Sequence, residues 1–350
     1  MIDTLKQWYE QHLTQKESVI LVVIMVLTFV LLTSMGDVLM PVLVALVLAY
    51  LMQGVADRLM RWGLNETFAL AGSSFLFLGV FLGFTVGIAP LVWRQLSNLV
   101  KEAPVMVEAV QRELTGFAAR YPSMIEQAPI DELLSSLQGQ AASFGQAVLG
   151  FGLSSIPGVL TFAIYMVLIP LMVFFFLKDR DLILRWALSF LPTDRPQLDR
   201  IGRAMNIQIA NYVRGKGIEI TIIGAVSYIA FTTFNLNYTA LLALLVGLSV
   251  IVPYIGAFLV TIPVMLVALL QFGLTGDFYW VVGLYMLIQV LDGNVLVPLL
   301  FSEAVDLHPV AIIIAVLVFG GLWGVWGVFF AIPLATLFNV LLVSWPRAVT

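Results

Sequence analysis

An acidic residue, Asp292, lies well inside an apolar stretch of the C-terminal half, with Gln289 before it and Asn294 after it. If this stretch crosses a membrane, a charge at that depth costs about 2.5–3.5 kcal/mol, and such residues tend to mark ion or substrate paths. A carboxyl group there can exchange a proton or, when ionised, bind a cation, and Gln289 and Asn294 are its candidate polar neighbours. The alternative is a structural acid whose hydrogen bonds hold a break at Gly293 in shape.

Other ionisable residues lie near predicted helix ends. Glu219 follows Lys216 by three residues, close enough to pair along a helix, and is the second candidate for ion coupling. The alternative for Glu219 is an ion pair at the membrane interface. The acids and the histidine of the loop 302–309 are explained by loop polarity and helix capping, with Pro309 at a first helical position.

Backbone breakers gather in the same half of the chain. Irregular backbone at membrane depth is tolerated only where it is buried in protein or lines a wet cavity, and discontinuous helices build the sites of many transporters. The alternative is that the glycines simply permit close helix packing. The candidate break positions are Pro253, Gly256, Pro298, Gly320 and Gly324.

Signatures of catalysis are missing from the sequence. It contains no cysteine, only two histidines, no Walker A glycine loop, no H-E-x-x-H motif and no G-x-S-x-G motif. We therefore expect no enzyme, no cofactor and no metal site. The formal net charge of −4 gives no reason to expect a nucleic-acid partner.

The elements that position these residues must be membrane helices. The 350 residues are 61% apolar and 11% charged, with a mean hydropathy of +1.02, whereas soluble domains carry roughly 25% charged residues. A packed soluble core of this size cannot hide that much apolar surface. We therefore predict an all-α, polytopic integral membrane protein.

Apolar runs of about 20 residues predict about eight transmembrane helices. The sixth and eighth runs are too long for one straight crossing, so we expect tilt, a kink or a broken helix in each. The predicted spans are residues 19–35, 38–53, 68–92, 156–177, 218–234, 240–270, 278–300 and 310–345.

Basic residues predict the orientation of these spans. With both termini in the cytoplasm, thirteen of the seventeen basic residues lie inside. The chain then divides into an N-terminal membrane part (1–92), an amphipathic extracytoplasmic segment (93–155), the fourth span (156–177), a basic cytoplasmic interfacial segment (178–217) and a C-terminal membrane part with broken helices (218–350).

The two segments between spans have amphipathic patterns. Apolar residues recur at helical spacing over 96–117 and 133–148, which predicts two helices whose apolar stripes need a cover. There are four alternatives for this cover: the two helices pack on each other in an intrachain hairpin, or they pack on the membrane surface, on a neighbouring copy of the chain or on a periplasmic partner protein. Residues 178–217 predict a helix at the inner interface that contacts anionic membrane lipids; the alternative is that its cations only determine topology.

Spaced motifs follow one another along the chain: LKD at 177–179, NYVRG at 211–215, VPYIG at 252–256, DGNVLVP at 292–298, DLHP at 306–309 and AIPLA at 331–335. In these motifs the chain resembles the AI-2E transporter family, of the autoinducer-2 exporter type, and within it the permeases of Gram-negative bacteria. The resemblance implies a bacterial inner-membrane protein of seven or eight helices that forms a homo-oligomer, with a pentamer as a candidate state. Some family members are assigned to signal-molecule export and others to Na⁺/H⁺ exchange, so the resemblance does not identify the cargo.

Two functions remain open at this point. The first is a permease that moves a small or amphipathic solute, driven by H⁺ or Na⁺, in which the broken sixth and eighth spans surround a polar site near Asp292. The second is an oligomeric membrane scaffold or envelope-assembly factor that binds a periplasmic partner through residues 93–155. The intramembrane acid and the backbone breakers favour the first function, and the long patterned segment favours the second.

Overall fold

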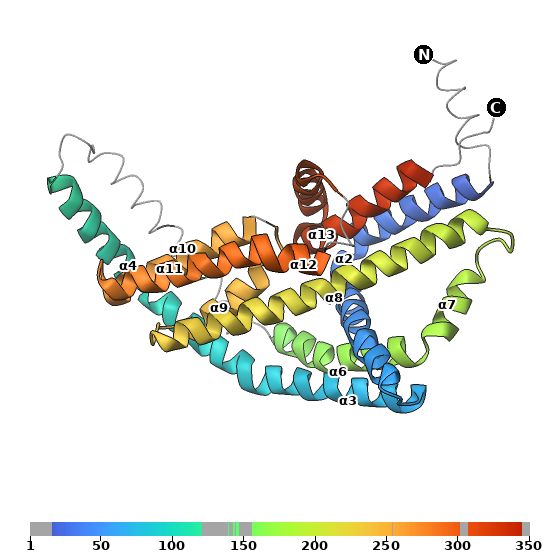
Figure 1. Cartoon of the computed structure of the whole chain (residues 1–350), viewed down its shortest axis with the longest axis horizontal. Helices are drawn as coiled ribbons and strands as arrows, with labels where there is room; N and C mark the ends of the chain where they lie inside the picture. Colours follow the sequence, from blue (N-terminus) through green and yellow to red (C-terminus); the bar gives the residue numbers. More distant parts are fainter. Residues whose placement is uncertain are drawn as a thin grey trace, which may run out of the picture.

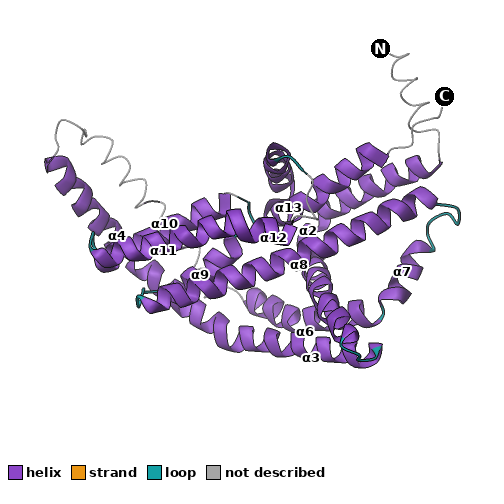
Figure 2. Ribbon diagram, in the orientation of Figure 1, coloured by secondary structure: helices purple, strands orange, loops and turns teal. Residues whose placement is uncertain are grey.

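Every regular element in the described part of the chain is a helix, which confirms the predicted all-α class (Figure 2). The amphipathic helix predicted at 133–148 lies almost entirely outside the described residues, and so do the loop acids within 302–306. The computed structural model describes residues 16–120, 156–253, 255–301 and 307–344, together with positions 139, 143, 145 and 146.

Several of the described helices are long and apolar enough to cross a membrane. Five meet this condition: Val38–Arg61, Glu66–Glu108, Leu160–Lys178, Ile255–Phe272 and Gly276–Phe301. The shorter apolar helices are Thr239–Ser249, Pro309–Gly324 and Trp326–Phe338. The polytopic architecture therefore agrees with the sequence, while the count of about eight spans stays a prediction.

The N-terminal helix α2 (Lys16–Arg61) contains both the first and the second predicted span. The two parts meet at a kink at Met35, where φ is −125° and ψ is 20°. Beyond the kink, α2 packs against α6 (Ile156–Lys178), and the contact buries Ala45 and Val173 completely. Small residues on α2 thus let the predicted fourth span, which coincides with α6, approach closely.

Helix α3 (Glu66–Gly83) opens a continuous helical run. The side chain of Asn65 caps α3 by accepting a hydrogen bond from the backbone N–H of Phe68 at 3.2 Å. The run continues through a π-helical turn, η1 (Phe84–Ile88), into α4 (Ala89–Arg120). The predicted third span and the first predicted amphipathic helix are therefore one helical run.

The segment 178–217 forms one short helix and the first part of a long helix that is continuous with the predicted fifth span. The short helix α7 (Arg180–Leu188) follows α6, and α8 (Pro196–Thr233) then runs without interruption through residue 217. Tyr212 and Val213 are buried in a core cluster, so this part of α8 packs inside the helical bundle. Helix α8 extends along the molecule and crosses α2 (Figure 1).

The C-terminal membrane part holds the largest core cluster among the described residues. Apolar side chains of α8, α9 (Thr239–Ser249), α10 (Ile255–Phe272) and α11 (Gly276–Leu291) build this cluster. Helix α9 crosses α8 backbone to backbone, because a Cβ on Gly247 would lie 3.1 Å from Cα of Gly224. The elements after α8 are α9 (Thr239–Ser249), α10 (Ile255–Phe272), α11 (Gly276–Leu291), the π-helical turn η2 (Asp292–Leu296), α12 (Val297–Phe301) and α13 (Pro309–Ser344).

Helices α9 and α10 form a hairpin around a break that includes residues 250–253. At the closed end, Gly256 approaches α9 so closely that a Cβ there would lie 1.8 Å from the carbonyl oxygen of Ser249. At the open end, the side chain of Gln271 holds the loop before α9 and accepts the N–H of Asn237 at 2.7 Å. The predicted sixth span therefore doubles back on itself.

Helix α13 is a second hairpin, because Gly324 has φ 60° and ψ −140°, a positive φ that favours glycine. A Cβ on Gly327 would lie 1.8 Å from the carbonyl oxygen of Phe319, and the rings of Phe319 and Phe338 lie 6.1 Å apart. Each apolar arm has between 10 and 17 residues, about 15–25 Å of helix, less than the roughly 30 Å of a bilayer core.

Candidate functional site

A cavity of about 380 Å³ lies where both hairpins meet the helices that carry the candidate acids. Helix α8 contributes Lys216 and Glu219 to its wall, and η2 contributes Asp292. Pro253, in the break between α9 and α10, also lines it, as do both arms of α13 through apolar side chains. The cavity therefore joins the two candidate acids, which the sequence separates by 73 positions.

Lys216 and Glu219 form a buried ion pair within this wall. The ammonium nitrogen of Lys216 lies 2.8 Å from a carboxylate oxygen of Glu219, and the two residues are only 5% and 1% exposed. The sequence left open an ion pair at the interface, where Glu219 could reach water. In the structure the ion pair is present but buried, because α8 continues within the helical bundle both before Lys216 and after Glu219.

The same ammonium group connects α8 to the first hairpin. Lys216 donates a hydrogen bond of 2.7 Å to the carbonyl oxygen of Val250 and lies 5.1 Å from the ring centroid of Phe301. Val250 directly follows α9, where carbonyl groups have no partner within the helix and the helix dipole is negative. A cation at this position thus stabilises the broken end of α9.

Asp292 begins the π-helical turn η2 and is 9% exposed. Within the described residues, its Oδ1 atom has no hydrogen-bond partner. The charge of Lys216 acts on Asp292, and the charge of Asp292 acts on Glu219. Among the residues lining the cavity, two carboxylates therefore face one ammonium group, and the fully ionised cluster carries a net charge of minus one.

The two predicted polar neighbours of Asp292 lie differently. Gln289 lines the cavity. Asn294 is exposed and donates a hydrogen bond of 2.9 Å to the carbonyl oxygen of Val290 on its own helix. Asn294 does not line the cavity, so only Gln289 stays with the candidate site.

Two of the candidate break positions lie at breaks. Pro253 lies between α9 and α10, and Gly324 forms the turn of α13. Gly256 lies in the first turn of α10 and serves the close contact of the hairpin, while Gly320 is helical and lies against Val328. Pro298 is also helical, in α12, so Gly256, Gly320 and Pro298 do not lie at the breaks expected for them.

The turn before Pro298 explains why the helix continues there. A proline normally clashes with the carbonyl four residues earlier, which here belongs to Asn294. Residues 292–296 form a π turn, in which the backbone N–H of Val297 bonds to the carbonyl of Asp292. This wider turn accommodates the proline ring, and it also places Asp292 at the cavity. At the start of α13, the Nδ1 atom of His308 accepts the N–H of Val310, which agrees with the expected capping.

Sequence reasoning assigned no role to Tyr212 and treated Lys216 only as a partner of Glu219. Tyr212 is buried, lines the cavity and donates a hydrogen bond of 3.0 Å to the carbonyl oxygen of Phe329 in α13. The motif at 211–215 was the one signal that pointed to this turn of α8. Among the described residues, no three Asp, Glu, His or Cys side chains gather as a metal site would require.

Comparison with known proteins adds an independent result. The model of the family described as AI-2E family transporter matches residues 19–347. A candidate permease named PerM from Escherichia coli strain K12 is 42% identical over 346 residues, which cover 99% of this chain and 98% of that protein.

More distant relatives also match this chain over most of its length. A candidate transport protein of Bacillus subtilis, YrrI, is 24% identical and matches 88% of this chain and 86% of its own length. A candidate transport protein of Mycobacterium tuberculosis is 27% identical and matches 85% of this chain and 80% of its own. Because the family model spans nearly the whole chain and its apolar helices suit a bilayer, this chain belongs to the AI-2E family of multi-pass membrane transporters.

Proposed function

We propose that this protein is a permease of the bacterial cytoplasmic membrane that moves a small or amphipathic solute, coupled to H⁺ or Na⁺ at Asp292. The observation that carries the proposal is the buried cluster of Asp292, Lys216 and Glu219 in a cavity bounded by two hairpins. The names of the three relatives describe a permease and transport proteins, and none describes a scaffold or an assembly factor.

The charge of the cluster explains how an ion could control the cavity. An isolated charge in a low-dielectric interior is strongly unfavourable, and it is tolerated when a counter-charge or a proton neutralises it. One proton or one monovalent cation brings the ionised cluster from minus one to zero. The loaded cavity can then close against apolar side chains, whereas the empty ionised cavity favours contact with water.

Lys216 connects this charge to the backbone that surrounds the cavity. Its ammonium group bonds to Glu219 and to the broken end of α9 at once. Loading Asp292 changes the electrostatic attraction on Lys216, because the two charges interact. In this proposal, the ammonium group transmits occupancy of the acid to the closed end of the α9–α10 hairpin.

The two hairpins enter the membrane from opposite sides if both termini are cytoplasmic. Helix α8 then ends outside, so the open end of the α9–α10 hairpin, held by Gln271, is also outside. Helices α11 and α12 return to the cytoplasmic side, where α13 begins. Each hairpin brings its apolar arms to the cavity from one compartment, which suits a site with alternating access.

Ion flux through the purified protein tests the proposal. Liposomes that contain only this protein and a trapped pH-sensitive dye are given a Na⁺ gradient and, separately, a pH gradient. We expect ion-dependent flux with the natural chain and its loss in Asp292→Asn, which keeps the size of the side chain but removes its titration. Asp277→Asn, at an exposed acid near the start of the same helix, is the matched control and should keep the flux.

Two outcomes contradict the proposal. If Asp292→Asn assembles normally and keeps the flux at every pH, Asp292 is not the coupling residue. If Asp292→Asn fails to assemble while Asp277→Asn assembles, the acid has the structural role that the sequence left open.

A further inference from the structure

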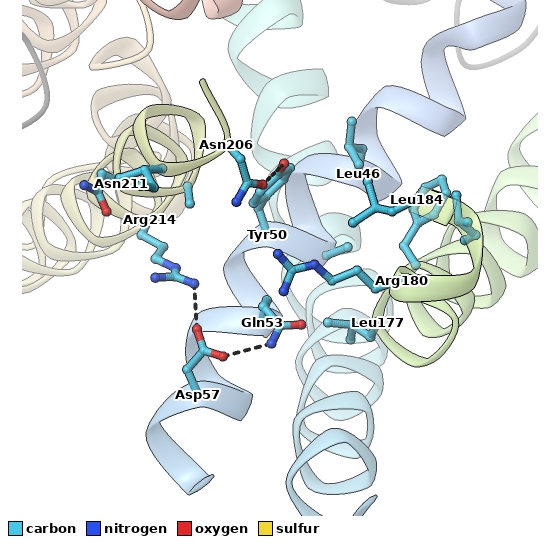
Figure 3. Close-up of a pocket in the computed structure, with 15 residues that line it drawn as sticks. Leu46, Tyr50, Gln53, Asp57, Leu177, Arg180, Leu184, Asn206, Asn211 and Arg214 are labelled. Atoms are coloured by element: carbon cyan, nitrogen blue, oxygen red, sulfur yellow. Dashed lines mark hydrogen bonds and ion pairs between the residues drawn. The ribbon is translucent and has the colours of Figure 1, made fainter. Parts of the chain in front are cut away.

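A second cavity, also of about 380 Å³, lies among α2, α6, α7 and α8 and shares no lining residue with the first (Figure 3). One part of its wall is polar and includes Tyr50, Asp57 and Asn206. Another part is apolar and includes Leu46 and Leu184. A cavity with both kinds of wall suits an amphipathic ligand.

The polar wall is ordered by contacts between α2 and α8. Arg214 lies 2.9 Å from one carboxylate oxygen of Asp57, and the amide of Gln53 donates to the other at 2.8 Å. The absence of a side chain at Gly54 lets Arg214 lie against α2, since a Cβ there would be 2.8 Å from its Nε atom. The charges of Arg214 and Asp57 therefore neutralise each other within the wall.

Because Arg214 and Asp57 neutralise each other, Arg180 gives this wall a net positive charge. Its guanidinium group extends from the start of α7 toward Tyr50 and Gln53 (Figure 3). In the described part of the chain it makes no hydrogen bond and no ion pair, and the acids on either side of it in the sequence do not line the cavity. Nearby, the hydroxyl of Tyr50 already donates to Asn206 at 2.8 Å. The free hydrogen-bond donors of Arg180 are thus available to an anion.

The outer side of α7 indicates where this anion comes from. Leu182 and Trp186 of α7 are 61% and 64% exposed, and Phe190, just after the helix, is 72% exposed. The rings of Trp186 and Phe190 meet edge to face at 5.2 Å. Exposed tryptophan next to basic residues on a short helix is typical of the headgroup depth of a membrane. Arg180 and Arg185 lie on this same helix. With α7 at this depth, the cavity would lie beside lipid headgroups.

From this juxtaposition we infer that the α2–α6–α7–α8 cavity binds the phosphate group of an anionic lipid. The guanidinium of Arg180 contacts the phosphate oxygens, because arginine presents several N–H donors to such groups. An acyl chain follows the apolar wall at Leu46 and Leu184 and continues past α7 into the bilayer. Inorganic phosphate offers the same oxygens but nothing to cover the apolar wall.

Lipid binding to the intact protein tests this site. The purified chain is titrated in mild detergent with phosphatidylglycerol and, separately, with phosphatidylcholine, and bound lipid is counted by native mass spectrometry. Arg180→Gln should weaken phosphatidylglycerol binding about fivefold, since one cation near a headgroup contributes about 1 kcal/mol. Arg185→Gln removes the same charge from the same helix outside the cavity and should bind like the natural chain.

Each alternative outcome overturns the site. Equal losses in Arg180→Gln and Arg185→Gln would mean that the cations attract lipid only as a diffuse charge. Displacement of phosphatidylglycerol by millimolar inorganic phosphate would mean that the cavity holds a free anion and not a lipid. Equal binding of phosphatidylcholine and phosphatidylglycerol would mean that Arg180 does not select charge. The melting temperature of Arg180→Gln, which alters an exposed side chain, is expected to match that of the natural chain.

Discussion

The ammonium group of Lys216 lies 2.7 Å from the carbonyl oxygen of Val250, 34 residues later in the chain. This single bond joins the middle of α8 to the broken end of α9. Glu219 balances the charge at 2.8 Å. The ion pair is therefore a structural connection between two helices as well as a part of the candidate coupling site.

Removing Lys216 should destabilise the protein strongly. Lys216→Met leaves the buried carboxyl group of Glu219 without its partner, and breaking a buried ion pair in this way costs about 3–5 kcal/mol. We expect a clearly lower melting temperature, measured by tryptophan fluorescence in detergent. The double variant Lys216→Met/Glu219→Leu should recover most of the loss, because it removes the carboxyl group of Glu219 that the single variant leaves without its ammonium partner. A double variant no more stable than Lys216→Met would contradict this account.

A methyl group at Gly256 should disturb the first hairpin. The added Cβ would lie 1.8 Å from the carbonyl oxygen of Ser249, so α9 and α10 must separate. Gly256→Ala is expected to lower the yield of folded protein and its melting temperature. Gly283→Ala is the control, since that Cβ meets nothing within 4 Å and alanine favours a helix by about 1 kcal/mol over glycine. The prediction fails if the two variants behave alike.

The orientation can be measured directly, because the chain has no cysteine. Cysteine introduced at Gln138, in the segment 93–155, should react with an impermeant thiol reagent in intact spheroplasts. Cysteine introduced at Asp194, in the loop between α7 and α8, should react only after the membrane is opened. The reverse pattern would overturn the placement of both termini in the cytoplasm.

Self-association is expected through the face of α3 and η1 that carries Gly79, Gly83 and Gly87. A Cβ at each of these glycines would meet nothing within 4 Å, so no part of the described chain packs closely against them. Such a face of small residues is available for close packing against a helix of another copy. Native mass spectrometry in mild detergent should show one defined oligomer, and Gly83→Leu should weaken it more than Gly283→Leu. A strictly monomeric protein in several lipids and detergents would exclude this interface.

Local patterns in the sequence predicted the helical class and singled out Asp292. Hydropathy alone identifies apolar helices, and an acid inside such a run has to lie against polar neighbours or water. The structure places Asp292 at a cavity, as expected of such an acid. The break around Pro253 was also visible, because proline and glycine occur together there.

The same local patterns could not predict contacts between residues that are far apart in the sequence. The burial of Lys216 depends on Val250 and on Phe301, and neither is a neighbour in the sequence. The hairpin form of α13 depends on a close approach of Gly327 to Phe319, which a hydropathy window records only as one long apolar run. The sequence also did not show that the first two predicted spans form one helix, since a kink such as that at Met35 leaves helical hydrogen bonds on both sides.

The helical run from α3 to α4 has one mechanical consequence. Its contour length is about 80 Å, far more than the roughly 30 Å of the hydrocarbon core. Gln95 on this run accepts the backbone N–H of Leu241 at 2.8 Å, and Glu102 accepts the hydroxyl of Tyr238. Burial and this carboxylate raise the pKa of the Tyr238 phenol above its ordinary value, so the phenol remains a donor. Two hydrogen bonds thus attach this helical run to the open end of the α9–α10 hairpin. A displacement of the run is therefore transmitted to that end of the hairpin.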